Sequence, residues 1–494
     1  MIDYAFKTTP FEHQNKVFLL SRDRESFALL MEQGTGKSKV IIDNAAWLYG
    51  QGKIDLLLIV APNGVHSNWV INELPAHMPD YVDYKAAWYG SSLKVKEKEA
   101  LQNTLQHDGL QIVTMNIEAL ATEKGVKFAK ELLQYKDAMF VVDESTTIKN
   151  PKAIRTKAVL KLAKFALYRR ILTGTPVTQG PLDLFSQFGF LDEDILQEGN
   201  YYAFRNRYAI MKEMRTAGRS FMIVDKYTNL DELENKIAPH SFRALKIYCL
   251  DLPDKLYQKH YVELSKNQAR IYKELKKEAI VEFDGGQLST SMAMIKFLRM
   301  QQVIGGFFQK DIVVDFDDNM QPIIGDKMPP QKIDEKNPRI EGLMNILDNT
   351  QGKVIIWARF RAEIAEIAEQ ISKQYGSQSY VEYHGGINNS DRSENIEAFQ
   401  NNPKCRYFIG HVQAGGKGLT LHAASTVVYY SNDFSLENRL QSEDRAHRIG
   451  QTKNVTYIDI VAKDTLDVQV VQVLRDKKSI ADMITGDVKL EEWL

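Results

Sequence analysis

Two regions of the chain alternate short apolar runs with longer stretches of helical periodicity. In the first region the apolar runs are 26–31, 55–61, 110–115, 138–143 and 169–173, and in the second they are 353–359, 379–384, 406–411, 426–431 and 455–461. Continuous apolar runs of this length that alternate with helices are typical of parallel strands buried on both faces. The pattern therefore predicts an α/β fold with two doubly wound parallel-sheet lobes in tandem, with functional residues at the carboxyl ends of the strands.

The segment between these regions has a different pattern. Residues 266–280 and 292–303 have helical periodicity, and residues 311–324 predict a hairpin around an Asp-Asp-Asn turn. We therefore expect a first lobe at 1–194, a largely helical insertion with a hairpin at 195–335, a second lobe at 336–475 and a C-terminal tail at 476–494.

Composition and charge narrow the function classes. The 494 residues contain 63 Lys and Arg against 64 Asp and Glu, so a polycation that coats nucleic acid is excluded and any nucleic-acid site must be a local patch. The longest apolar run, Leu56 to Ala61, is far shorter than the roughly 20 residues of a membrane span. The N-terminal residues have no apolar signal core, and Cys249 and Cys405 are expected to be buried thiols. These features favour a cytoplasmic protein that does not bind membranes.

A glycine-containing turn follows the first predicted strand and precedes a helix. Backbone N–H groups that converge at a helix N-terminus bind phosphate. Lys37 would reach the β- and γ-phosphates and Ser38 would bind Mg²⁺. The general P-loop pattern begins with Gly where this chain has Met31, and an ordinary turn with a surface lysine is the alternative. The candidate ATP-binding residues of the turn are Gly34, Thr35, Gly36, Lys37 and Ser38.

Two acidic residues end a later apolar strand. Asp143 would hold Mg²⁺, and Glu144 would orient and deprotonate the attacking water. An Asp-Glu pair at a strand end also occurs by chance, but here it accompanies the glycine turn. Upstream, the amide of Gln14 can donate to and accept from an adenine edge. A capping or surface glutamine is the alternative for Gln14.

Arginines near the end of the second region are candidate catalytic groups. Arg445 and Arg448 are three residues apart, so a helix would present them on one side. Guanidinium groups bind phosphate bidentately and keep their charge. The alternative is a solvated helix in which Glu443 and Asp444 neutralise them. Residues 413–419 form a second glycine-rich loop after a strand.

Several segments together resemble a known family. The most specific are 172–191 (LTGTPVTQGPLDLFSQFGFL), 143–150 (DESTTIKN), 251–255 (DLPDK) and 446–451 (AHRIGQ). The chain resembles the Swi/Snf-type DNA translocases of helicase superfamily two, and among them compact bacterial or phage members. The resemblance implies two RecA-like lobes with ATP between them, Mg²⁺ as cofactor, and ATP hydrolysis coupled to DNA.

The resemblance also assigns residues. It implies that Gln14 contacts adenine, that Lys37, Glu144, Arg445 and Arg448 are catalytic, and that Gly416, Gly418 and Gln441 belong to the ATP-binding residues. The chain departs from the family at Asp433-Phe434-Ser435-Leu436, where Asp-Trp-Asn-Pro is usual. The DNA contacts that the family implies are Asn63, Trp69, Thr114, Asn116, Arg359, His384 and Gln413.

Two local charge excesses agree with a DNA partner. Residues 205–226 and residues 255–278 each carry a net charge of +4. Phosphate contacts give salt-dependent, sequence-independent binding, although positive helix faces can simply be solvated. We expect an ATP-dependent translocase on duplex DNA. The alternatives are a strand-separating helicase, the motor subunit of a restriction or defence complex with a separate nuclease chain, and a non-enzymatic nucleotide-gated scaffold.

Overall fold

The protein is described here by a computed structural model. The described residues are 4–63, 65–90, 93–216, 219–284, 290–309, 311–316, 322–327, 329–415 and 419–484. Contacts divide the chain into two compact units. Unit 1 comprises 1–211, 224–251 and 477–494, and unit 2 comprises 212–223 and 252–476.

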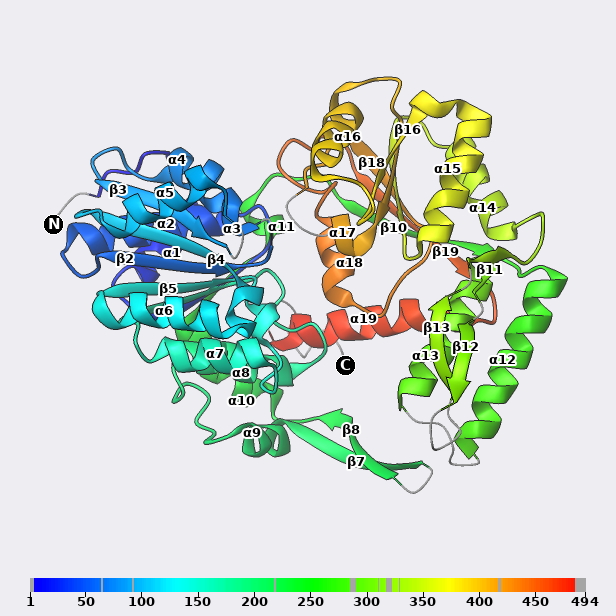
Figure 1. Ribbon diagram of the computed structural model, residues 1–494, viewed down its shortest axis with the longest axis horizontal. Helices are drawn as coiled ribbons and strands as arrows, with labels where there is room; N and C mark the ends of the chain where they lie inside the picture. Colours follow the sequence, from blue (N-terminus) through cyan, green and yellow to red (C-terminus); the bar gives the residue numbers. More distant parts are fainter. Residues whose placement is uncertain are drawn as a thin grey trace. The chain divides into compact units, whose positions relative to one another are not determined.

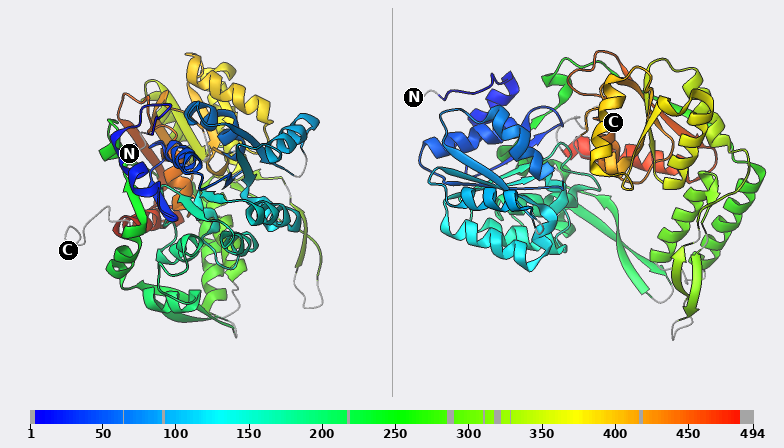
Figure 2. Two further views of the ribbon diagram at one scale, coloured as in Figure 1. Left: turned by 90° about the vertical axis from the view of Figure 1, so that its left-hand side faces the viewer. Right: turned by 45° about the horizontal axis from the view of Figure 1, so that its top comes forward.

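Unit 1 contains a seven-stranded sheet in the order β3-β4-β2-β5-β6-β1-β9 (Figure 1), and every neighbouring pair is parallel. Its strands are β1 (Ser26–Met31), β2 (Leu56–Ala61), β3 (Tyr84–Tyr89), β4 (Leu110–Asn116), β5 (Ala138–Asp143), β6 (Tyr168–Leu172) and β9 (Ser241–Ala244). The order of the strands requires helical crossovers, and helices cover both faces of the sheet (Figure 2).

The helices of unit 1 pack on the apolar side chains that alternate along these strands. In β2, Leu56, Leu58 and Val60 enter one core cluster, and Leu57, Ile59 and Ala61 enter the cluster on the other face. The helices are α1 (Glu12–Ser21), α2 (Lys37–Gly50), α3 (Val65–Asn68), α4 (Leu74–His77), α5 (Val95–Leu105), α6 (Glu123–Tyr135), α7 (Ile154–Ala163), α8 (Leu184–Leu191), α9 (Tyr201–Tyr208), α10 (Leu230–Ile237) and α11 (Lys246–Cys249).

Unit 2 contains a six-stranded parallel sheet in the order β10-β19-β18-β15-β17-β16. Its strands are β10 (Lys255–Val262), β15 (Lys353–Ala358), β16 (Tyr380–Tyr383), β17 (Tyr407–His411), β18 (Ala424–Tyr429) and β19 (Val455–Ala462). The helices are α12 (Lys266–Asp284), α13 (Thr290–Ile304), α14 (Pro338–Asp348), α15 (Arg361–Tyr375), α16 (Asn389–Asn401), α17 (Val412–Gly415), α18 (Leu436–Glu443) and α19 (Leu466–Ile484). The short strands β11 (Phe307–Phe308) and β14 (Gln331–Lys332) pair with each other.

The two predicted sheets are confirmed, and all ten apolar runs form strands in them. The predicted helices at 266–280 and 292–303 correspond to α12 and α13, and the predicted hairpin is β12 (Asp311–Phe316) with β13 (Pro322–Lys327). The edge strands β3, β9 and β10 were not predicted, nor was a second hairpin formed by β7 (Ala209–Thr216) and β8 (Arg219–Tyr227). The segment 195–335 is shared between the two units rather than compact on its own.

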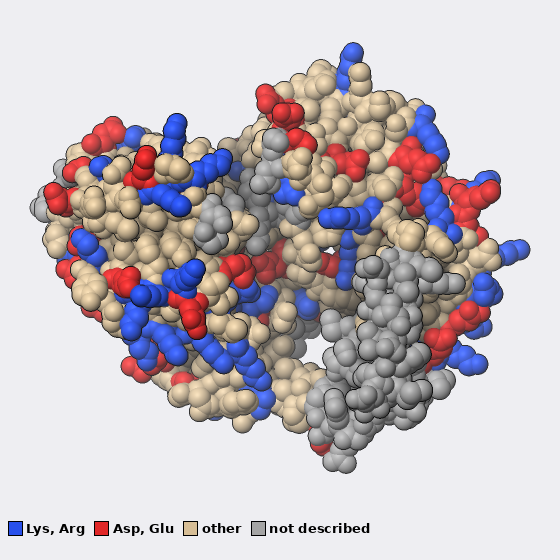
Figure 3. Space-filling view, in the orientation of Figure 1, with Lys and Arg blue, Asp and Glu red and all other residues tan. Residues whose placement is uncertain are grey.

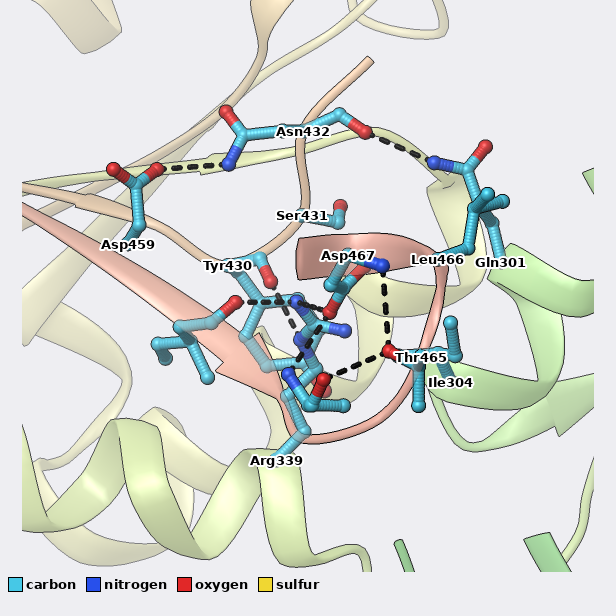
Figure 4. A network of polar contacts seen from close by, with 12 residues as sticks. Gln301, Ile304, Arg339, Tyr430, Ser431, Asn432, Asp459, Thr465, Leu466 and Asp467 are labelled. Atoms are coloured by element: carbon cyan, nitrogen blue, oxygen red, sulfur yellow. Dashed lines mark hydrogen bonds and ion pairs between the residues drawn. The ribbon is translucent and has the colours of Figure 1, made fainter. Parts of the chain in front are cut away.

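A buried arginine joins the elements of unit 2 (Figure 4). Arg339 of α14 donates to the carbonyl oxygens of Tyr430 and Ile460, each at 2.6 Å, and pairs with Asp467 at 2.8 Å. Tyr430 directly follows β18, Ile460 lies in β19 and Asp467 lies in α19. The Arg339 side chain therefore connects α14 to these three elements. None of the helices in the described ranges has the length and apolarity needed to cross a bilayer.

Candidate active site

The glycine turn of unit 1 joins the end of β1 to the start of α2. Gly34 and Gly36 have φ of 80° and 90°, in the left-handed region that favours glycine. A Cβ on Gly36 would lie 2.1 Å from Nε2 of Gln14. The turn therefore needs glycine at position 36 for both its backbone conformation and its close contact with α1.

Lys37 lies in the first turn of α2 and folds back over the glycine turn. Its Nζ donates to the carbonyl oxygen of Met31 at 2.9 Å and to that of Glu32 at 3.3 Å. Thr35 is fully buried, and its hydroxyl also donates to Glu32 O at 2.7 Å. Lys37 is therefore a fixed part of the turn rather than a freely solvated surface lysine, and Ser38 follows it at the N-terminus of a 14-residue helix.

The acidic pair ends β5 in the same unit. Asp143 Oδ2 accepts a hydrogen bond of 2.9 Å from the indole of Trp69, and Oδ1 accepts one of 3.0 Å from the backbone N–H of Glu144. Burial raises the pKa of Asp143, while the Trp69 hydrogen bond and the positive charge of Lys37 act to lower it.

Glu144 has an unusual backbone conformation. Its φ is 52°, in the left-handed region, where a residue with a side chain is strained. Its Oε1 accepts a hydrogen bond of 3.2 Å from Nε2 of Gln33, which lies in the glycine turn. Gln33 was not among the predicted site residues, although its position inside the glycine turn could have indicated it.

Gln14 contacts both its own helix and the glycine turn. Its Oε1 accepts from the backbone N–H of Phe11 at 3.0 Å, which is a helix-capping contact, and its Nε2 donates to the carbonyl oxygen of Thr35 at 3.1 Å. His13 also contacts Thr35 O, with a 2.8 Å distance from Nε2. The structure thus places Gln14 against the glycine turn, while its contact with adenine stays a prediction.

The arginine motif of unit 2 differs from the expected helix. Helix α18 ends at Glu443, so Arg445 and Arg448 lie in the turns that follow it. Their guanidinium groups nevertheless converge, because Nη1 of Arg445 and Nη1 of Arg448 donate to the carbonyl oxygen of Leu419 at 3.3 and 2.9 Å. Arg445 Nε also donates to Gln441 O at 2.9 Å. Gly416 and Gly418, which precede Leu419, lie outside the described residues.

A buried carboxylate anchors this motif. Glu443, 3% exposed, accepts hydrogen bonds from Arg439 Nε and from the Tyr257 hydroxyl, both at 2.8 Å. Lys255 Nζ lies 3.4 Å from the same carboxylate, and Nε2 of His447 lies 2.7 Å from the carbonyl oxygen of Pro253. These contacts join the segments 251–255 and 446–451, which are far apart in the sequence. Because Glu443 and Arg445 are both buried, this segment is not a solvated helix.

The predicted DNA contacts lie in different environments. Trp69 is 1% exposed and Thr114 is fully buried with its hydroxyl bonded to His66 O at 2.9 Å. These two side chains therefore offer no surface to DNA, and the prediction for them is corrected: each has an internal positioning role. The contacts that stay predictions are Asn63 and Gln413, which are exposed, and Asn116, Arg359 and His384, which are half-buried.

Arg359 is held by its neighbours in unit 2. Its guanidinium donates to Oε1 of Gln301 on α13 and lies 5.4 Å from the ring of Phe360. Gln301 in turn donates to the carbonyl oxygen of Asn432 at 3.2 Å, and Asn432 donates to Asp459 at 2.8 Å (Figure 4). Burial lowers the pKa of Arg359. The insertion helix α13 therefore positions this predicted contact residue.

Comparisons with known proteins agree with these motifs. The SNF2-related domain matches residues 13–304, and the helicase conserved C-terminal domain matches residues 336–450. An uncharacterised ATP-dependent helicase of Mycoplasma genitalium is 27% identical over 452 residues, which are 91% of this chain and 39% of that protein. A TATA-binding protein-associated factor of Saccharomyces cerevisiae is 27% identical over 385 residues, which are 70% of this chain and 20% of that protein.

Among solved structures, the SWI2/SNF2 ATPase core of Sulfolobus solfataricus in complex with dsDNA is similar to this chain. It has 22% sequence identity and a TM-score of 0.43, and the match covers 100% of this chain and 97% of that one. The chain spans 39% of the Mycoplasma relative and 20% of the yeast relative. Because the SNF2-related domain alone matches more than half of the residues, the chain belongs to the SNF2-related family.

Proposed function

We propose that this protein is an ATP hydrolase that uses the energy of hydrolysis to translocate along double-stranded DNA. The observation that carries the proposal is the hydrogen bond from Gln33, in the glycine turn that contains Lys37, to Glu144 of the acidic pair that ends β5. The name of the Mycoplasma relative, an ATP-dependent helicase, supports ATP use.

The residues of the glycine turn fit a triphosphate. The left-handed glycines leave the backbone without side chains where phosphates would approach, and the N-terminus of α2 favours negative charge. Lys37 already donates to two carbonyl oxygens, so phosphate oxygens can replace these acceptors without a new desolvation of the amine. Hydroxyl and carboxylate oxygens are ligands that Mg²⁺ accepts. Ser38 and Asp143 would hold Mg²⁺, which when bound supplies positive charge that neutralises the phosphate oxygens.

Glu144 is the proposed general base. It would accept a proton from the water that attacks the γ-phosphate, with Gln33 holding Oε1 in position. The strained φ of Glu144 supports this role, because strain of this kind clusters at functional sites. Arg445 and Arg448 would stabilise the charge that develops on the phosphate oxygens.

DNA as the partner is supported by charge and by the family. The excess of positive charge in 205–226 and 255–278 suits contacts with phosphate, which do not depend on sequence. A protein that moves along DNA must not stop at particular bases, so backbone contacts are appropriate for it. The strand-separating helicase and the motor subunit of a nuclease-containing complex remain the alternative functions.

Triplex displacement distinguishes translocation from strand separation. A third strand bound to a duplex should be released in the presence of ATP, while a blunt duplex of the same length stays paired. Glu144→Gln serves as the hydrolysis-deficient control and should release neither. Unwinding of the duplex would favour the helicase alternative, and loss of neither strand despite ATP hydrolysis would contradict the translocase proposal.

A further inference from the structure

The chain contains a long basic stretch with no acidic residue, outside the two patches already described. Between Glu144 and Asp183, residues 145–182 include eight Lys and Arg and no Asp or Glu. The protein as a whole has a net charge of −1, so the positive charge of this stretch is a strong local excess. It includes all of helix α7.

Helix α7 separates its apolar and basic residues into two faces. Val159 and Leu162 are buried in the core of unit 1. Lys157, Lys161 and Lys164 are exposed, and their spacing of four and three residues places them in one line along the opposite face. Figure 3 shows Lys and Arg side chains gathered on the lower part of unit 1, over the region of α7 and α9 in Figure 1. We call these three residues the α7 lysine row.

The positive charge of the row is largely uncompensated. No ion pair among the described residues involves Lys157 or Lys161. Lys164 pairs with Glu193 at 3.0 Å, but these side chains are 65% and 71% exposed. An ion pair this exposed contributes little and is readily exchanged for another anion.

The row begins beside a loop that is a predicted DNA contact. Near the start of α7, Arg155 donates to Glu118 Oε1 at 2.7 Å and to Thr147 O at 2.9 Å. Glu118 lies in the short helix η2 (Ile117–Ala121), for which Asn116 is the N-cap. Helix α7 packs against η2, so the helix that carries the lysine row is a direct neighbour of the Asn116 loop.

The length and chemistry of the row match a nucleic-acid backbone. Lys157 and Lys164 are separated by about 10 Å of helix axis, and duplex DNA carries about six phosphate charges over this distance. Lysine is depleted at protein–protein interfaces, whose centres are apolar or aromatic. Leu160, which lies between Lys157 and Lys164 along the helix, is half-buried against the core, and the exposed Ile154 and Phe165 lie beyond the ends of the row.

We propose that the α7 lysine row binds the phosphate backbone of double-stranded DNA, as an extension of the DNA contact of unit 1 beyond the Asn116 loop. This inference rests on the proposed function, because it extends the path of the same DNA. Its contacts are independent of base sequence, and they increase the affinity for DNA without taking part in ATP hydrolysis.

The test compares two charge-matched variants. The row variant is Lys157→Gln/Lys161→Gln/Lys164→Gln, in which glutamine keeps a high helix propensity. The control variant is Lys94→Gln/Lys96→Gln/Lys98→Gln, which removes three exposed lysines at α5 of the same unit. Binding of a fluorescent 30-base-pair duplex is measured across a series of salt concentrations, and ATPase rates are measured with and without that duplex.

We expect the row variant to bind the duplex about tenfold more weakly or worse at about 0.1 M salt, with a salt slope smaller by about 2 to 3. Its ATPase rate without DNA and its rate at saturating DNA should equal those of the wild type. The control variant should bind like the wild type. A row variant that binds DNA with the affinity and salt slope of the control would overturn the proposal.

Two further outcomes are informative. If the row variant binds polyglutamate of matched charge more weakly than the wild type does, but binds the duplex equally well, the row binds an acidic polypeptide and the DNA proposal is wrong. If the wild type shows no DNA-stimulated ATPase but the row variant still loses duplex affinity, the proposed function fails while the binding surface stands.

Discussion

The indole of Trp69 donates a 2.9 Å hydrogen bond to the carboxylate of Asp143, and both side chains are buried. Trp69 begins a short π-helix, Trp69–Glu73, between α3 and α4. π-Helical turns are rare and occur frequently at functional sites. The loop after β2 therefore controls the position and ionisation of the proposed Mg²⁺ ligand at the end of the neighbouring strand β5.

The pH dependence of ATP hydrolysis tests this relationship. Burial raises the pKa of Asp143, so its ionised form is complete only at a higher pH than for an ordinary carboxyl group, and activity should be lost as the pH falls through this pKa. The Trp69 hydrogen bond lowers the pKa, so Trp69→Phe should move the acid limb of the kcat/KM profile to higher pH.

The matched control for this experiment is Trp47→Phe. The Trp47 indole also donates to an aspartate, Asp23, at 3.0 Å, but at the surface. Its replacement should leave the pH profile unchanged. An acid limb that stays in place in Trp69→Phe would show that the indole does not tune the reacting carboxylate.

Replacement of the proposed base separates nucleotide binding from hydrolysis. Glu144→Gln keeps the size of the side chain but cannot accept the proton of the attacking water, so turnover should fall by about 10²- to 10⁴-fold. Affinity for ATP, measured by titration with a fluorescent analogue, should be close to that of the wild type. Glu131→Gln on α6 is the control, and near-normal turnover in Glu144→Gln would remove Glu144 from this role.

Arg448 is the better test of the arginine motif because it is less buried than Arg445. Arg448→Ala removes one donor to Leu419 O, whereas Arg445 keeps its own contact with that oxygen. The variant should bind ATP and lose DNA-stimulated hydrolysis by about 10³-fold or more. Lys453→Ala, nearby in the sequence and exposed, should behave like the wild type. Retention of stimulated hydrolysis in Arg448→Ala would contradict a catalytic role.

The buried charges behind this motif predict a large effect on stability. Arg439 pairs with Asp459 and with Glu443, and its guanidinium lies 3.5 Å from the ring centroid of Tyr429. Arg439→Ala leaves the buried carboxylate of Asp459 without its cation and leaves Glu443 with Lys255, 3.4 Å away, which should lower the free energy of unfolding of unit 2 by about 3–5 kcal/mol. Thermal and urea unfolding measure this change. Arg406→Ala, which loses contacts with two carbonyl oxygens and with the Tyr407 ring but breaks no buried ion pair, should cost far less.

The central strands β2 and β5 were predictable from the sequence because they are almost entirely apolar. β2 and β5 are buried at every position, so their sequences contain no polar residue until the strand ends. The edge strands β3 and β10 have mixed burial and mixed sequences, and periodicity does not separate them from loops. Whether a strand lies at the edge depends on the whole sheet, and the local sequence pattern does not contain this information.

The site was predictable in its residue types but not in its supporting contacts. The glycine turn and the acidic pair each had a local pattern, and the sequence also identified Arg445 and Arg448. Their placement after α18 and the burial of Trp69 result from long-range packing, such as the contact of Tyr257 with Glu443. A residue that acts through another side chain leaves no spacing signal of its own.

The ATPase rate measured with no nucleic acid, with single-stranded DNA, with duplex DNA and with RNA, at one salt concentration, tests the central claim most directly. We predict a low basal rate that duplex DNA increases most and that Glu144→Gln abolishes. A rate that no nucleic acid changes, or the absence of ATP hydrolysis under all four conditions, would contradict the proposal that this protein is a DNA-driven motor.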